Sequence, residues 1–71
     1  MMEEIRDEQL KEFLEWYRSH YTKDATFEAS LQLSMAGEFH LTAKQARPLI
    51  ARCLSLGFVK KGGDKFLRIL V

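Results

Sequence analysis

Large apolar residues in the first third of the chain recur at helical spacing. They are separated by three or four positions, which places them on one stripe of an α-helix: Leu10, Phe13, Leu14, Tyr17 and Tyr21. Asp7 precedes the stripe and is expected to cap the helix, where an acidic side chain also suits the helix dipole. Glu12 and Glu15 are predicted to lie on a solvated face, with an acidic partner-binding face as the alternative. The segment therefore predicts a first helix that buries one stripe.

A polar break at residues 22–24 separates this helix from a second apolar segment. A second helix is predicted to begin at a cap formed by Thr26 or Ser30 and to run to about Phe39. Residues 25–28 are alternatively a short strand, because the β-branched and aromatic side chains there favour extended structure. The start of the second helix thus has two interpretations.

A third helix is indicated by signals at both of its ends. Thr42 and Gln45 have the spacing of a capping box, and Gly57 suits a left-handed C-terminal cap. The inner face between them is apolar: Ala46, Leu49, Ile50, Cys53, Leu54 and Leu56. Cys53 is accordingly predicted to be a small core residue, because a reactive thiol needs an exposed cationic setting.

The last segment changes to an extended pattern interrupted by Gly62-Gly63. Two glycines between strand-like runs predict a β-hairpin with a two-residue turn, since both central positions need positive φ. That turn sets a register of opposite residues: Lys61 with Asp64, Lys60 with Lys65, Val59 with Phe66 and Phe58 with Leu67. Phe58, Leu67, Ile69 and Val71 would then cover the helices. Lys60 and Lys65 would face each other, an arrangement favoured by an anion between them or tolerated by lysines that swing into water.

Charge is divided unevenly between the two halves of the chain. Residues 1–40 carry four basic and nine acidic side chains, whereas residues 41–71 carry seven basic and one acidic, so the net charges are −5 and +6. An excess of this kind in one half indicates an anionic partner, of which nucleic acid is the commonest. A solvated basic face without a ligand is the competing interpretation.

Composition excludes several other classes. At 71 residues with 46% hydrophobic side chains, the chain predicts one folded domain over residues 1–71. Its apolar runs predict neither a membrane span nor a secretory signal, and the single cysteine suits a reducing cytoplasm. There is no glycine-rich phosphate loop, no nucleophile with a paired base and no metal-ligand spacing around His20 and His40. An enzyme is therefore not expected, and neither is a cofactor or metal.

Residues 35–58 resemble, position by position, the helix-turn-helix of bacterial winged-helix transcription regulators. The matching positions are an apolar residue and alanine, two apolar residues around the turn, a capping hydroxyl, and a Gly-apolar pair: Met35, Ala36, Phe39, Leu41, Thr42, Gly57 and Phe58. The resemblance implies an α+β, mainly helical fold, a three-helix winged helix-turn-helix with a C-terminal β-hairpin wing. It also implies a regulatory or replication-associated nucleic-acid-binding module, with duplex DNA favoured. Winged helices also serve as protein–protein adaptors, which is the alternative function.

The DNA contacts expected on this basis come from the third helix and the wing: Thr42, Lys44, Gln45, Arg47, Lys60, Lys61 and Lys65. A partner or dimer surface is expected at the aromatic edge of the first helix, at Phe13, Trp16 and His20. Because one small module rarely binds a DNA site tightly, a homodimer or incorporation in a larger complex is expected.

Two positions depart from the family pattern. His40 stands where the family favours glycine, at a turn position that tends toward left-handed φ. Pro48 would be the sixth residue of the third helix, where it removes a hydrogen bond to the carbonyl of Lys44. Either the helix kinks, or residues 42–47 form a separate turn and the main helix begins at Pro48.

Overall fold

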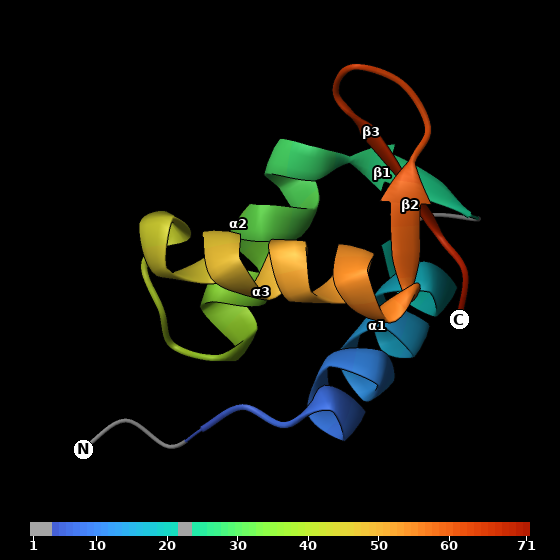
Figure 1. Cartoon of the computed structure of the whole chain (residues 1–71). Coiled ribbons are helices and arrows are strands. Elements are labelled where there is room, and N and C mark those ends of the chain that lie inside the picture. The colour runs from blue at the N-terminus through green and yellow to red at the C-terminus, as the bar shows by residue number, and fades with distance from the viewer. Residues whose placement is uncertain (1–3, 22–23) are drawn as a thin grey trace.

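The computed structural model describes residues 4–21 and 24–71. Within these ranges, three helices and three strands follow one another along the chain: α1 (Asp7–Tyr21), β1 (Ala25–Phe27), α2 (Glu28–Glu38), α3 (Ala43–Leu56), β2 (Val59–Lys61) and β3 (Phe66–Ile69). Figure 1 shows α3 crossing in front of α2, with α1 below and the β2–β3 hairpin rising as a wing. The fold is α+β and mainly helical, with the layout of a three-helix winged helix-turn-helix.

The stripe of α1 is buried as predicted up to its last member. Leu10, Phe13, Leu14 and Tyr17 are buried, but Tyr21 is 67% exposed, so its assignment to the core was wrong. The capping prediction was also wrong, because Asp7 is the first residue of the helix itself. The carbonyl of Arg6 accepts from the amide of Leu10, and the amide of Arg6 donates to the side chain of Gln9 at 2.8 Å.

The strand interpretation of the segment before α2 is confirmed. β1 spans Ala25–Phe27, and α2 begins at the next residue with Phe27 in extended backbone at the cap position. Neither Thr26 nor Ser30 caps the helix. The Thr26 hydroxyl lies 2.9 Å from the Tyr17 hydroxyl, so it ties β1 to α1 instead.

The hairpin has a different register from the one predicted. β3 is the central strand and pairs antiparallel with both β1 and β2, in the order β1-β3-β2. Val59 lies opposite Ile69 and Lys61 opposite Leu67, so residues 62–65 form the loop and a two-residue turn was wrong. Val59 and Ile69 are directly opposite and share the inner face of the sheet with Leu67, which is two residues from Ile69, and all three side chains are buried.

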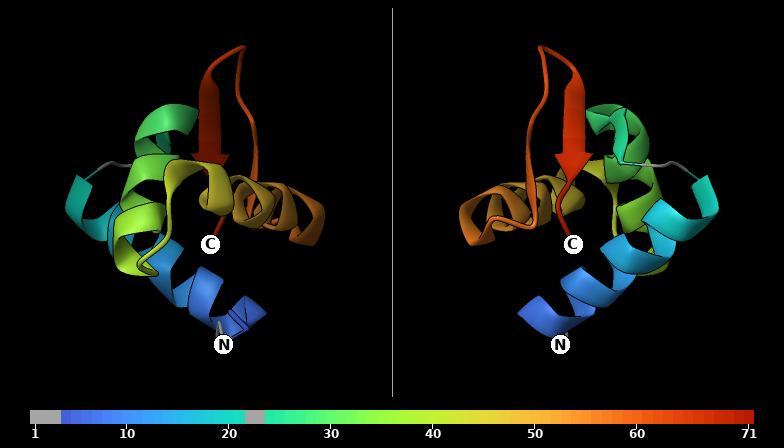
Figure 2. Two further views of the ribbon diagram at one scale, coloured as in Figure 1. Left: turned by 90° about the vertical axis from the view of Figure 1, so that its left-hand side faces the viewer. Right: turned by 90° about the vertical axis from the view of Figure 1, so that its right-hand side faces the viewer.

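The core lies between the three helices and the inner face of the sheet. Its members come from every helix and from β2 and β3: Leu10, Phe13, Leu14, Tyr17, Leu31, Met35, Leu49, Ile50, Cys53, Val59, Leu67 and Ile69. The two side views in Figure 2 show the hairpin standing above the helices, its loop projecting beyond them. The wing is therefore anchored at its base by the core, and its loop is tied to the start of α2 by the hydrogen bond from the Glu28 amide to the Lys65 carbonyl.

Candidate nucleic-acid interface

The beginning of α3 is fixed by the predicted capping box. The Thr42 hydroxyl accepts from the amide of Gln45 at 3.1 Å, and the Gln45 side-chain oxygen accepts from the amide of Thr42 at 3.0 Å. Thr42 and Gln45 were both predicted to contact nucleic acid. Their oxygens accept the two capping bonds, so the Thr42 hydroxyl hydrogen and the Gln45 side-chain NH₂ group both remain as donors for a ligand.

The turn that precedes α3 sets its angle to α2. His40 has φ of 56°, the left-handed region expected for this position. The amide of Leu41 donates to the carbonyl of Ala36 at 2.8 Å, and the side chain of Gln32 donates to the carbonyl of Ala43 at 2.5 Å. These bonds connect α2 to the first turn of α3, so the residues of that turn are held on a rigid support.

Pro48 does not interrupt α3. The helix runs from Ala43 to Leu56 with Pro48 inside it and ends at Gly57, which has φ of 79°. A separate turn over residues 42–47 was therefore wrong. Pro48 itself is exposed, so its ring points to solvent while the carbonyl of Lys44 goes without its usual amide donor.

The outward face of α3 carries two cations without an internal partner. Lys44 and Arg47 are exposed, and neither forms an ion pair with any of the residues that the structure describes. Ala51 follows on the same face because positions i, i+3 and i+7 share one side of a helix. No acidic residue occurs in α3, so this face is positive along its first turns and carries only the small side chain of Ala51 beyond them.

The three predicted wing lysines have three different surroundings. Lys60 lies on the outer face of β2, opposite Arg68 and not opposite Lys65 as predicted. Lys61 is engaged with Glu28 at 3.1 Å. Lys65 is exposed in the loop, where its carbonyl accepts from the amide of Glu28 at 2.8 Å.

Acidic residues of the N-terminal half neutralise part of the basic half. Besides the Lys61 pair, Arg68 meets Asp24 at 3.3 Å. Arg52 meets Asp7 at 2.7 Å and also donates to the carbonyl of Ile5 at 2.6 Å. Three of the seven C-terminal cations are thus paired, and four remain without an ion pair among the described residues: Lys44, Arg47, Lys60 and Lys65.

The four unpaired cations form two groups. Lys44 and Arg47 lie in the first turns of α3, whereas the wing leaves α3 at its other end (Figure 1). The sequence predicted contacts from both of these segments, but it did not predict Asp24 and Glu28 as counter-charges on the wing. No local pattern could have found these two acids, because they reach the wing only through the pairing of β1 with β3.

The aromatic edge of α1 is partly as predicted. Trp16 is 42% exposed and its ring stacks on His20 with centroids 4.8 Å apart, while the His20 ring nitrogen Nδ1 lies 2.9 Å from the Trp16 carbonyl oxygen. Tyr21 joins the group with its edge against Trp16. Phe13, in contrast, is a core residue with 5% exposure. The exposed aromatic surface therefore consists of Trp16, His20 and Tyr21.

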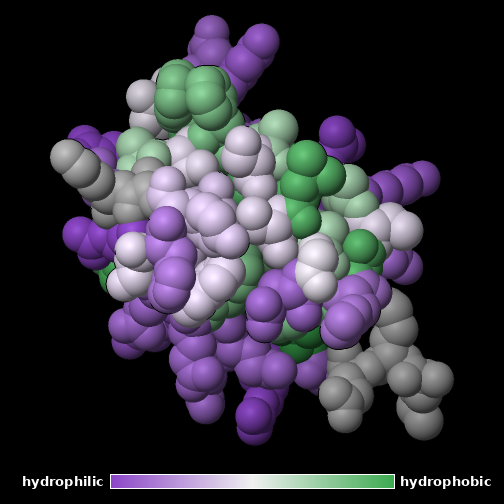
Figure 3. All heavy atoms as spheres, turned by 180° about the vertical axis from the view of Figure 1, so that it is seen from behind, coloured by the Kyte–Doolittle hydropathy of each residue, from purple (hydrophilic) through white to green (hydrophobic). Residues whose placement is uncertain are grey.

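A second exposed aromatic group lies on the outer face of the sheet. Phe27 and Phe66 are directly opposite on β1 and β3, and their rings stack with centroids 4.5 Å apart. Seen from behind, a hydrophobic patch lies near the top of the molecule with hydrophilic side chains projecting above it, and hydrophilic residues line the lower edge (Figure 3). This pair was not predicted, because no local pattern pairs residues 25–28 with the last strand. We interpret it as a cross-strand contact that fixes β1 against the wing.

Cys53 has the properties of a core residue. It is fully buried, and burial raises the pKa of its thiol to about 11, with a lowering contribution from Arg52 and a raising one from Asp7. The thiolate is therefore scarce at neutral pH. The described part of the chain contains no group of three or more His, Cys, Asp or Glu side chains placed to hold a metal ion.

Across residues 4–21 and 24–71, no helix has both the length and the apolar character needed to cross a membrane. Comparison of the chain with protein-family models, curated proteins and solved structures finds no match. A functional interpretation accordingly depends on the arrangement of the residues described above.

Proposed function

We propose that this chain is a nucleic-acid-binding module that holds duplex DNA with the outer face of α3 and with the wing. The observation that carries the proposal is the face formed by Lys44, Arg47 and Ala51, which is exposed, cationic and free of acidic side chains. A helix with small residues behind its cations can enter a major groove, where the cations reach phosphates or base edges.

The separation of the cations into two groups favours an extended polyanion over a small anion. A ligand that meets both Lys44 and Arg47 on α3 and Lys60 and Lys65 on the wing must carry negative charge over a considerable length, as nucleic acid does. We further propose that the module acts in the cytoplasm in a regulatory or replication-associated role, since its single buried cysteine suits a reducing compartment.

The salt dependence of binding tests the proposal. Contacts from four cations predict that log K falls with log salt at a slope of about −3 to −4 in fluorescence anisotropy with a random duplex. Lys44→Ala and Arg47→Ala should each flatten the slope by about one. Lys11→Ala is the matched control, because Lys11 is an exposed lysine on α1. An affinity no better than about millimolar at about 50 mM salt, or an equal effect of Lys11→Ala, would refute the proposal.

One observation favours a second function, that of a protein–protein adaptor. Trp16, His20 and Tyr21 form an exposed aromatic group on α1, and aromatic residues of this kind often anchor interfaces. An adaptor predicts that Trp16→Ala abolishes partner association and that the double change Lys60→Ala with Lys65→Ala leaves it intact. The opposite result would exclude this function.

A further inference from the structure

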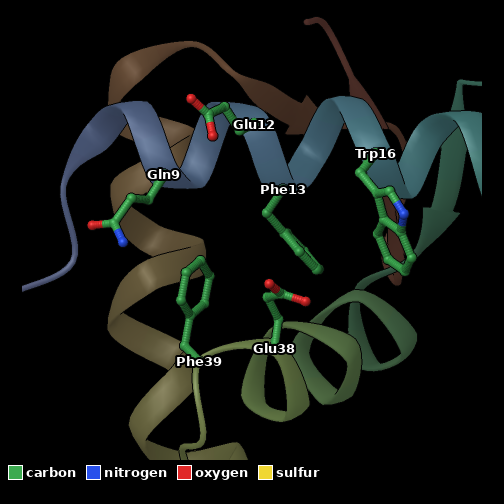
Figure 4. A pocket seen from close by; sticks show the side chains of 6 residues that line it. All are labelled: Gln9, Glu12, Phe13, Trp16, Glu38 and Phe39. Carbon is green, nitrogen blue, oxygen red and sulfur yellow. The ribbon is translucent and has the colours of Figure 1, made fainter.

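A groove runs between α1 and the turn that joins α2 to α3. It consists of two adjoining hollows of about 330 and 580 Å³ that share Gln9, Glu38 and Phe39 in their walls. Figure 4 shows Phe13 pointing from α1 toward the end of α2 and Phe39 pointing back toward α1, with Trp16 descending from α1 on the other side of Phe13. The ring centroids of Phe13 and Phe39 are 5.8 Å apart. The floor of the groove is therefore aromatic, and Leu41 and Leu49 extend it as an apolar surface in the second hollow.

The rim of the groove is acidic. Glu12 and Glu38 line the first hollow from opposite sides, and Glu4 lines the second. None of these three carboxylates forms an ion pair among the residues that the structure describes. Arg52 also lines the second hollow, but Asp7 already neutralises it at 2.7 Å. A ligand bound in the groove thus contacts apolar side chains on the floor and unpaired carboxylates on the rim.

We propose that this groove binds a basic amphipathic segment of a partner protein. An apolar side chain of that segment packs against Phe13, Phe39 and Trp16, while its cations meet Glu12 and Glu38. Charge complementarity selects this occupant over a second copy of the chain, because a two-fold contact through the groove would bring two acidic rims together. The groove shares Trp16 with the aromatic group proposed for an adaptor, and the proposal does not depend on nucleic-acid binding.

The groove and the proposed DNA surface lie on different faces of α3. Gln45, Leu49 and Arg52 line the groove at positions i, i+4 and i+7, which share one side of the helix. Lys44 and Arg47 project from another side. A peptide bound in the groove therefore does not cover Lys44 and Arg47.

Trp16 provides the experimental signal, since it is the only tryptophan of the chain and lines the groove. The probe is a synthetic helical peptide of about 18 residues, or five turns, with leucines on one face, lysines on the other and no aromatic residue. Binding should shift the Trp16 emission to shorter wavelength, and calorimetry gives the affinity independently. Two further peptides, one with glutamates for the lysines and one with alanines for the leucines, should each bind at least about tenfold more weakly.

A matched pair of double variants locates the binding site. The double variant Glu12→Lys with Glu38→Lys reverses the charge of the rim and should weaken binding of the lysine peptide by about tenfold or more. Glu8→Lys with Glu15→Lys makes the same change of net charge on exposed positions of α1 outside the groove, and should weaken it much less. Circular dichroism verifies that both variants are folded.

Three results would overturn the proposal. The first is failure of the lysine peptide to bind the wild-type chain, and the second is equal weakening by the two double variants. The third is a Trp16 emission shift that appears on raising the protein concentration alone, together with a dimer in light scattering, because the groove would then hold a second copy. The nucleic-acid proposal is unaffected by any of them, since Lys44→Ala and Arg47→Ala test it separately.

Discussion

The two basic segments of the molecule, the start of α3 and the wing, are positioned by different kinds of interaction. Thr42 bonds to Gln45 three residues away, and the amide of Gly57 bonds to Leu54 at the other end of α3. The wing is instead held by β1, whose residues lie far away in the sequence. The same long-range contact brings Glu28 to Lys61. Local signals therefore give α3 its shape and leave its cations free, whereas tertiary pairing both places the wing and neutralises part of its charge.

Loss of a buried anchor of the wing should have the largest effect. Leu67 on β3 is fully buried, so Leu67→Ala should lower the free energy of unfolding by about 2–5 kcal/mol through lost transfer energy and a cavity. Urea unfolding followed by Trp16 fluorescence measures the change. Leu70→Ala removes the same atoms from a side chain that is 52% exposed, and should cost far less. Equal costs for the two leucines would contradict the observed register.

Removal of the proline from α3 should have the next largest effect, in the stabilising direction. Pro48 is exposed inside the helix, and Pro48→Ala restores a donor for the carbonyl of Lys44. The free energy of unfolding should rise by about 1–3 kcal/mol. Hydrogen exchange should reveal a protected amide at position 48. A loss of stability, or an unprotected amide there, would show that α3 is not continuous through this position.

Truncation of the α3 cap should have a moderate effect. Thr42→Ala removes the acceptor for the amide of Gln45 and should destabilise the chain by about 1 kcal/mol. Thr42→Ser keeps an acceptor in place and should retain most of the stability. Both variants are compared with wild type by urea unfolding. Identical unfolding curves for Thr42→Ala and Thr42→Ser would show that the hydroxyl does not support the helix.

The sequence predicted those features of the fold that depend on neighbouring residues. The capping box at Thr42, the left-handed cap at Gly57 and the left-handed φ of His40 all depend on residues within one or two turns. The helical stripe of α1 and the burial of Cys53 follow equally from short-range spacing.

The sequence did not predict the features that depend on distant residues. The glycine pair suggested a two-residue turn, but the hairpin register is set by the burial of Val59 and by the pairing of β3 with β1. Aspartate is a residue type that commonly caps helices, but the Asp7 carboxylate instead accepts a hydrogen bond from Arg52, which lies 45 positions later. Local spacing therefore predicted the exposed face of Lys44 and Arg47 on α3, whereas it did not predict that Glu28 pairs with Lys61 on the wing.

Release of the wing lysine from its counter-charge should have the smallest effect on stability. Lys61 and Glu28 are 57% and 37% exposed, so Glu28→Gln should change the free energy of unfolding by no more than about 0.5 kcal/mol. If the wing contacts phosphate, the freed Lys61 should steepen the salt dependence of DNA binding by up to about one unit. Glu15→Gln is the control, because it removes the same charge from an exposed position on α1. A steeper salt dependence in Glu28→Gln alone would show that the ion pair restrains Lys61. An equal change in both variants would show that only the net charge of the chain matters, and that the ion pair does not distinguish the wing from α3.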